Sequence, residues 1–477
     1  MVSPLFYYQL ALLALVWLFL MLHLTWPKRS AATPTAPATP IQSKRTRSNE
    51  PTPFAGLTTK PPCALCAREA VHPQPAPPVS PAPMPPTHRR PRTVDTSQHC
   101  CPQTGCRYRG WLGRGNVRAN GHPSGGRWRQ FQCTSCEGYF LETHGTIFHG
   151  TQVAVELIVH VLACVAEGLG MRATARVFAV DPNTVLRWLV EAAEQLTAFA
   201  AYFLCDVHVN QVQLDELYAV LREVKDGTLS EDEAIQRLER SRHWVWTAID
   251  PESKLVLVIE IGPRTLAMAQ CVVHRVVQKL AASCVPLWLT DGNRDYTMAF
   301  LAHFGFWHQP ERTRVQGPAP RPRWLPLPEL LYAQVVKSYR RRRLVAVKPR
   351  VVFGTLEAIE QVLAVCGWKI NTAFVERLNL DIRQRVAAVG RRVNTLCQGE
   401  DGMQHQLALF HTYYNFVLPH RSLRQALPES KSINGVGSAK QWLPCTPAMA
   451  AGLTDHVWTL KEVLMFRVPP WPQPHAV

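Results

Sequence analysis

Strand-like and helix-like segments alternate between residues 208 and about 420, and this alternation constrains the fold of the 477-residue chain more than any other feature. The stretch VNQVQLD, residues 209–215, alternates apolar and polar residues as a half-buried strand does. HWVWTAID and LVLVIEIG indicate a hairpin across a turn at 250–253, a helical segment follows at about 266–282, and VPLWLTD indicates a short buried strand. This pattern predicts a mixed α/β domain.

Three acidic residues occupy defined places in this pattern. Asp215 ends the first predicted strand, Asp291 ends the later strand, and Glu376 lies on the amphipathic helix NTAFVERLNLDIRQRV. Strand, strand and helix in this order match an RNase H-like sheet, and acids crowded in this way need cations. Glu216 is expected to face the other side of its strand and is therefore less favoured as a metal ligand. We therefore predict that Asp215, Asp291 and Glu376 are catalytic.

The chemistry of these acids predicts the cofactor. Carboxylates are hard oxygen ligands that suit Mg²⁺ or Mn²⁺. Two such ions activate an attacking water or DNA 3′-hydroxyl and stabilise the leaving oxygen of an in-line displacement. The predicted cofactor of the Asp215, Asp291 and Glu376 site is therefore a pair of Mg²⁺ or Mn²⁺ ions.

Two cysteine pairs ahead of this domain have metal-ligand spacing. Four thiolates on two short loops suit one structural Zn²⁺, as in a zinc ribbon, and the Gly- and Asn-rich stretch between the pairs suits a β-hairpin. The open alternatives for a ligand are Cys100 and His122, because the first pair is spaced more widely than usual. The predicted zinc ligands are Cys101, Cys106, Cys133 and Cys136.

Residues 171–195 predict two helices around a tight turn, with Asp181 as a suitable N-cap and Pro182 as a suitable first helical residue. Val177 on the first helix and Leu186 on the second are expected to be buried. This is the layout of a DNA-binding helix-turn-helix, although two helices that simply pack together remain the alternative. The residues expected to meet base edges are Asn183, Thr184 and Arg187.

The N-terminal region differs from the rest. No charged residue occurs from Leu5 to Trp26, which is long enough for one membrane-spanning helix of about 20 residues. Basic residues follow it, and the positive-inside rule then leaves the remaining chain in the cytoplasm. Residues 1–27 are expected to form a transmembrane anchor, with a misassigned start codon as the alternative. A cleaved signal peptide is not favoured, because no basic residue precedes the run.

Composition divides the rest of the chain. Residues 28–98 are rich in Pro, Ala and Thr and are expected to be a disordered linker. Within it, Cys63 and Cys66 form a CxxC pair for which no second cysteine pair is assigned. The net charge of +17 points to a polyanionic partner. The fourteen cysteines indicate a reducing compartment.

The predicted domains are a zinc ribbon at 99–148, an all-α helix-turn-helix at 150–205, an RNase H-like catalytic domain at 206–425 with an insert at 297–368, and a C-terminal extension at 426–477.

Several strings between about residues 100 and 465 resemble a known family. They are QLDELY, RHWVWTAID, LWLTDGNRDY, NTAFVERLNLDIRQRV, HTYYNFVLPHRSLR and TPAMAAGLTDHVWT. They resemble the DDE transposases of bacterial insertion sequences, closest to the insertion sequence 1 family. The resemblance implies a homo-oligomeric enzyme that recognises the double-stranded DNA of element ends and joins it to target DNA. It also implies the DDE roles for Asp215, Asp291 and Glu376.

The spacing departs from the family. Asp291 and Glu376 lie 85 residues apart (376 − 291), and the intervening segment carries the basic run Lys337–Arg343. Beside an active site for DNA, such a run is expected to contact phosphates. The further residues expected to bind DNA are Arg340, Arg341, Arg377 and Arg383.

Two other functions stay open at this point. A former transposase retained as a non-catalytic, membrane-tethered DNA-binding regulator would explain the apolar N-terminus and the long linker. A nuclease of the same fold would share the metal chemistry without strand transfer. The expected location is the cytoplasm and nucleoid, with attachment to the inner face of the cell membrane if residues 1–27 form an anchor.

Overall fold

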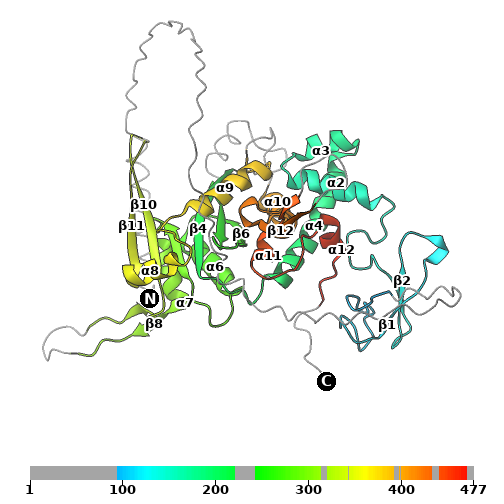
Figure 1. Cartoon of the computed structure of the whole chain (residues 1–477), viewed down its shortest axis with the longest axis horizontal. Helices are drawn as coiled ribbons and strands as arrows, with labels where there is room; N and C mark the ends of the chain where they lie inside the picture. The colour runs from blue at the N-terminus through cyan, green and yellow to red at the C-terminus, as the bar shows by residue number, and fades with distance from the viewer. Residues whose placement is uncertain are drawn as a thin grey trace, which may run out of the picture. The chain divides into compact units, whose positions relative to one another are not determined.

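The computed structural model describes most of the chain beyond residue 93 (Figure 1). The predicted anchor at 1–27, the predicted linker up to residue 93 with Cys63 and Cys66, and the segment 221–241 lie outside the described residues. Within the described part, no helix has both the length and the apolar character needed to cross a bilayer. The described ranges are 94–220, 242–312, 320–341, 343–390, 397, 399–431 and 440–469.

A six-stranded mixed sheet forms the centre of the predicted catalytic domain. Its strands, in sheet order, are β11 (Arg343–Phe353), β10 (Tyr332–Arg340), β7 (Leu287–Asp291), β4 (Gln211–Val220), β5 (Arg242–Ile249) and β6 (Val256–Gly262). The strands β4, β5 and β6 run antiparallel, β7 is parallel to β4, and β10 is parallel to β7. This mixed α/β arrangement is consistent with the RNase H-like domain that the sequence predicts.

Each face of the sheet carries its own apolar core. On one face, α6 (Leu266–Val277) and α7 (Asp295–Phe304) cover a core that includes the fully buried Trp246 and Trp288. On the other, α9 (Ala373–Arg385) and α10 (Glu400–Thr412) cover a smaller core. Successive strand residues point to opposite faces, so β4 contributes buried side chains to both cores.

Part of the segment predicted as an insert belongs to the central fold. Residues 297–368 were expected to interrupt the domain, yet they include most of α7 and all of β10. β10 pairs with β7 along the pocket edge and buries Tyr332 and Ala333, so it is a strand of the core sheet. The remaining elements of this segment are the hairpin of β8 (Gly305–His308) and β9 (Arg323–Pro326), the edge strand β11, and α8 (Leu356–Ala364).

The predicted helix-turn-helix residues form α2 (Val155–Ala166), α3 (Met171–Phe178) and α4 (Pro182–Phe203). The Asp181 carboxylate accepts a hydrogen bond from the Asn183 amide at 2.8 Å, which confirms the predicted N-cap. The expected burial of Val177 and Leu186 is wrong, because these side chains are 65% and 44% exposed. α3 packs instead through Thr174 and Ala175, and residue 177 lies about 200° around the helix from residue 175.

The C-terminal extension packs back onto the helical region. After the π-helical turn η3 (Tyr413–Val417) and the 3-10 turn η4 (Arg421–Leu423) come β12 (Gln425–Lys431) and β13 (Lys440–Leu443), which pair with each other, then α11 (Pro447–Ala450) and α12 (Leu460–Met465). Phe199 of α4 lies with its ring centroid 5.2 Å from Trp458 and 5.3 Å from Phe466. These aromatic contacts tie the end of the chain to α4.

Residues 99–148 form a small three-stranded antiparallel sheet. Its strands are β1 (Val117–Ala119), β2 (Gln130–Cys133) and β3 (Tyr139–Leu141), with the short turn η2 (Pro123–Gly125) between β1 and β2. The apolar cluster beneath the sheet consists of only Val117, Phe131 and Phe140 among the described residues. A core of this size cannot hold a domain together alone.

Candidate active site

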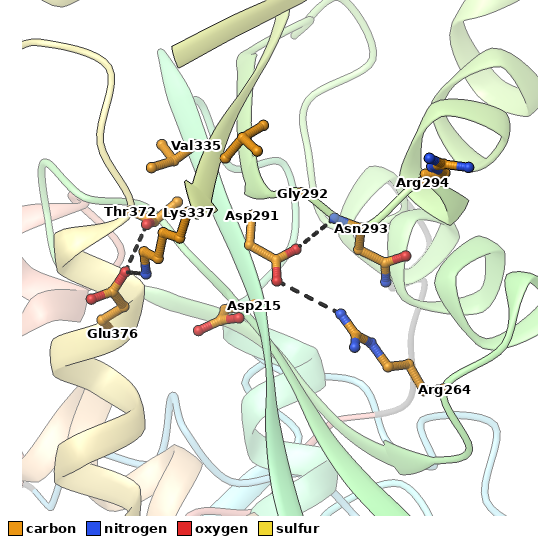
Figure 2. A pocket seen from close by; sticks show the side chains of 11 residues that line it. Asp215, Arg264, Asp291, Gly292, Asn293, Arg294, Val335, Lys337, Thr372 and Glu376 are labelled. Atoms are coloured by element: carbon orange, nitrogen blue, oxygen red, sulfur yellow. Dashed lines mark hydrogen bonds and ion pairs between the residues drawn. The ribbon is translucent and has the colours of Figure 1, made fainter. Parts of the chain in front are cut away.

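A pocket of about 710 Å³ opens where β4, β7, β10 and the start of α9 meet. The three acids predicted from the sequence, Asp215, Asp291 and Glu376, all line it (Figure 2). Residues far apart in the chain therefore share one cavity. The complete lining is Asp215, Arg264, Asp291, Gly292, Asn293, Arg294, Val335, Val336, Lys337, Thr372 and Glu376.

Strand pairing places Asp215 beside Asp291. Leu214 of β4 is the partner of Thr290 of β7, so the residue after each one lies at the same level of the parallel pair. Asp291 is the last residue of β7, as predicted. Asp215 does not end its strand: β4 continues to Val220, because the buried residues beyond Asp215 extend its pairing with β5.

Glu376 is placed by a contact between β4 and the start of α9. The buried Gln213 side chain donates to the Asn371 carbonyl at 3.0 Å and accepts from the Val375 amide at 3.2 Å. Gln213 lies two residues before Asp215 on the same face of β4. The same strand therefore carries one acid and fixes the first turn of the helix that carries another.

The Glu376 carboxylate has two partners in the pocket. The Thr372 hydroxyl donates to it at 2.8 Å, and the Lys337 ammonium forms an ion pair with it. Lys337 comes from β10 and belongs to the basic run noted in the sequence, but its contact with an acid was not foreseen. A cation already compensates the negative charge at this edge of the pocket.

Glu216 contradicts the expectation drawn from strand alternation. Its carboxylate lies within 4.8 Å of those of Asp215 and Asp291, so the three acids form one cluster. The strand does alternate as predicted, since Leu214 joins the α6 and α7 core and Leu217 the α9 core. Asp291, however, is the last residue of β7, so carboxylates on either face of the sheet can approach its side chain. The Glu216 side chain is only 1% exposed.

Two polar partners hold the buried Glu216 carboxylate in this position. The Asn293 side-chain amide donates to it at 3.2 Å, and the Arg264 guanidinium forms an ion pair with it at 3.0 Å. Arg264 also lies 3.7 Å from Asp291. Arg264 stands alone in the turn between β6 and α6, so nothing in the sequence pattern singles it out.

The Asp215 carboxyl holds its proton unusually strongly. Burial raises its pKa to about 7, and the negative charges of Asp291, Glu216 and Glu376 add to the rise. One oxygen accepts from the Asn379 side-chain amide at 2.8 Å, and the Thr247 hydroxyl donates to Asn379 at 3.2 Å. Asn379 was missed as a site residue although it lies in the ERLNL string.

These donors fit a hard divalent cation. The carboxylates of Asp215, Glu216 and Asp291 lie close together, whereas Glu376 lines the same pocket without belonging to this group among the described residues. Burial and the charges of the neighbouring acids both raise the pKa of Asp215. A divalent ion would relieve that repulsion, and carboxylate oxygens are the ligands that Mg²⁺ and Mn²⁺ prefer.

The residues predicted to bind DNA lie outside this pocket. Asn183 and Arg187 are exposed at the start of α4, while Thr184 is half-buried. The exposed arginines of the catalytic domain lie on two elements, the β10–β11 hairpin and α9; among the described residues, the pocket lining includes none of them. They are Arg340, Arg341, Arg377 and Arg383.

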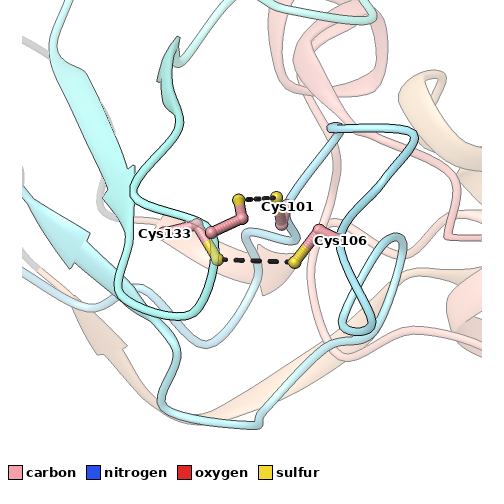
Figure 3. A group of neighbouring side chains, drawn as sticks. Cys101, Cys106 and Cys133 are labelled. Carbon is pink, nitrogen blue, oxygen red and sulfur yellow. Dashed lines mark hydrogen bonds between the residues drawn. The ribbon is translucent and has the colours of Figure 1, made fainter.

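The four predicted zinc ligands form a second cluster. The Sγ atoms of Cys106 and Cys133 lie 3.7 Å apart (Figure 3), those of Cys101 and Cys136 lie 3.6 Å apart, and all four lie within 4.8 Å of one another. A tetrahedral zinc site with Zn–S bonds of about 2.3 Å has sulfur–sulfur edges of about 3.8 Å. The thiols therefore have the spacing of a zinc tetrahedron.

The alternative ligands do not join this cluster. Among the described residues, the metal-competent group at the ribbon consists of the four thiols without Cys100 or His122. His122 is exposed and contacts the Gly126 carbonyl at 3.1 Å. The Asn116 side-chain amide lies 3.3 Å from the Cys133 sulfur, a contact that supports a thiolate there.

Comparison with known proteins identifies no family for the chain. No protein-family model matches the chain, and no curated protein matches it. A chain in the crystal structure of the Mos1 strand transfer complex aligns with 31% of this chain at 15% sequence identity, with a TM-score of 0.13. The alignment covers 55% of that chain, so it spans about half of its length.

Proposed function

We propose that the chain is a DDE transposase that cuts DNA and joins the cut strand to a target with the help of divalent metal ions. The observation that carries this proposal is the convergence of Asp215, Asp291 and Glu376 on one pocket. The motif strings that resemble insertion-sequence transposases support it, and membership closest to the insertion sequence 1 family is part of the proposal. So is a homo-oligomer acting on paired DNA ends.

In this proposal, some residues of the pocket bind the metal ions and another positions a metal ligand. Asp215 and Asp291 would hold the metal ions, with Glu376 completing the set and Glu216 as a further oxygen donor at the cluster. When bound, the ions supply Lewis-acid activation of the attacking oxygen and charge stabilisation of the leaving oxygen. The amide of Asn379 orients Asp215 for this task.

The cations around the pocket suit a phosphodiester substrate. Arg264 and Lys337 both line the cavity and both pair with its acids. When metal ions neutralise the carboxylates, these side chains are available for the phosphate oxygens of DNA, which charged donors bind well. We propose that both contact the phosphate backbone beside the bond that is cut.

The other predicted DNA contacts extend this surface. Asn183, Thr184 and Arg187 begin a helix with a confirmed N-cap, the place from which a recognition helix reads base edges. We propose that they read the element ends, while the arginines of the β10–β11 hairpin and α9 bind phosphates. The zinc ribbon has a structural role in this proposal, because its four thiols leave no open coordination position.

A joining assay tests the proposed function. The full-length chain is incubated with DNA from the genomic ends that flank its gene, a target plasmid, and Mg²⁺ or a chelator. We expect cleaved ends and new junctions with the plasmid, and neither product in the chelator. Cleavage without junctions would instead support the same-fold nuclease. DNA binding without either product would support the regulator, against which the complete set of carboxylates already argues.

The raised pKa of Asp215 predicts how stability depends on pH and metal. Between about pH 4 and pH 7 the folded chain keeps a proton that the unfolded chain has released, so the free energy of unfolding falls as pH rises through this range. Divalent ions would remove the penalty above it. We expect added Mg²⁺ to raise the melting temperature more at about pH 8 than at about pH 5.

Thermal unfolding of the wild type and the Asp215→Asn variant at both pH values, with and without Mg²⁺, measures this effect. The variant lacks the titrating group, so its melting temperature should depend less on pH and respond less to Mg²⁺. An identical dependence in the two proteins would contradict the assignment of the effect to Asp215.

A further inference from the structure

The β8–β9 hairpin displays large aromatic side chains to solvent. Trp307 is 57% exposed, Trp324 is 42% exposed and Phe306 is 44% exposed. Trp307 and Trp324 are paired residues of the two strands, so they lie on the same face of the hairpin, with ring centroids 5.7 Å apart. Exposed tryptophan side chains that adjoin one another indicate a binding surface rather than a core.

The hairpin is held in place at both ends of its ladder. At its base the Leu327 amide donates to the Phe304 carbonyl at 2.8 Å. Beyond the last paired residues, the Gln309 side chain donates to the Pro320 carbonyl at 3.0 Å. The tryptophan rings are therefore presented on a bridged, two-stranded support.

The charge around the rings identifies the kind of partner. Arg323 precedes Trp324 on β9 and so points to the opposite face of the hairpin, and Arg321 lies two residues further out; both residues are exposed and make the hairpin basic. Aromatic faces beside guanidinium groups are the combination that binds single-stranded nucleic acid, since bases stack on the rings and phosphates pair with the cations.

The hairpin is also connected directly to the pocket. Arg294 lines the pocket, α7 begins at the next residue, and the hairpin leaves the C-terminal end of α7. A ten-residue helix is about 15 Å long, which is within the reach of a few nucleotides of DNA. A DNA strand held in the pocket can therefore extend to the tryptophan rings.

We infer that Trp307 and Trp324 form a stacking platform for unpaired bases of the DNA strand next to the bond that is cut. The platform rests on the proposed function for its choice of DNA, and it adds a preference for single-stranded or frayed ends over intact duplex. Arg321 and Arg323 bind the phosphates of the same strand.

Binding of fluorescent oligonucleotides to the full-length Asp291→Asn protein tests the platform without any chemical step. The Trp307→Leu/Trp324→Leu double variant, made in that background, should lose roughly tenfold or more in affinity for single-stranded DNA and much less for blunt duplex. The Trp307→Phe/Trp324→Phe variant keeps aromatic faces and should retain most of the binding. Trp442→Leu is the matched control, because Trp442 is 41% exposed but the Arg424 guanidinium, 4.0 Å from its ring centroid, already covers the ring face on which a base would stack.

Two results would overturn the inference. One is equal affinity of the Leu double variant and the parent for single-stranded DNA. The other is a change in oligomeric state with unchanged DNA binding, which would make the hairpin a contact between copies of the chain. Failure of the joining assay together with loss of binding in the Leu variant would instead leave the platform intact and remove the transposase proposal.

A crosslinking measurement on the wild type needs no substitution. Single-stranded DNA carrying 5-iodouracil is irradiated with the full-length chain, and the modified peptides are identified by mass spectrometry. The inference predicts crosslinks at Trp307 or Trp324. Crosslinks confined to other parts of the chain would contradict it.

Discussion

Replacement of Asp291 with asparagine is expected to abolish both cleavage and joining of DNA, with a loss of rate of at least about a thousandfold. The substitution keeps the size and shape of the side chain and removes one negative charge from the cluster of three acids. A neutral amide is a poorer ligand than a carboxylate for the divalent ions that the proposed reaction requires. The rate is measured in the joining assay with Mg²⁺ in excess.

The fold should survive this substitution. Removal of one of several crowded charges relieves repulsion in the pocket, so the melting temperature without metal should stay the same or rise. Asp401→Asn makes the same chemical change at an exposed position of α10 outside the pocket and should leave activity unchanged. Unchanged activity of Asp291→Asn would refute the assignment of Asp291 as a metal ligand.

Replacement of Cys133 with serine is expected to remove the zinc and unfold the ribbon. Cys133 is fully buried, and the apolar cluster of the small sheet consists of only Val117, Phe131 and Phe140 among the described residues. We therefore expect zinc binding to supply most of the folding free energy of this unit, as in other small zinc domains. The zinc content should fall from about one ion per chain to near zero.

Elemental analysis combined with limited proteolysis measures both consequences. The variant should be cut rapidly between residues 99 and 148, while the catalytic domain stays resistant. Cys205→Ser is the control, because Cys205 is exposed and lies outside the thiol cluster. A wild-type chain without zinc would contradict the ribbon.

The sequence predicted those parts of the fold that depend on local patterns. The N-cap at Asp181 and the strand ending in Asp291 follow from residues a few positions apart, and both are confirmed. The burial of Val177 and Leu186 was predicted wrongly because only the packing of three helices decides which side of a short helix is covered. The full length of β4 also depends on a partner strand that the pattern does not reveal.

The sequence predicts a site residue when that residue follows a recognisable strand pattern. It does not predict a side chain that reaches the site from a different strand, helix or turn. Asp215 and Asp291 could be placed because each follows an apolar strand segment. Arg264, Lys337 and Asn379 could not, since each reaches an acid from another element. Glu216 was less favoured as a metal ligand on strand alternation alone, a rule that does not take into account the end of a neighbouring strand.

Titration of the full-length chain with Mn²⁺, followed through the EPR signal of the free ion, tests the carboxylate site without any DNA substrate. The four thiols of the ribbon prefer zinc, so Mn²⁺ reports on the oxygen ligands. We predict that the wild type takes up Mn²⁺ and that Asp291→Asn loses most of this uptake while Asp401→Asn retains it. Equal Mn²⁺ uptake by the wild type and Asp291→Asn would contradict a metal site at Asp215, Asp291 and Glu376.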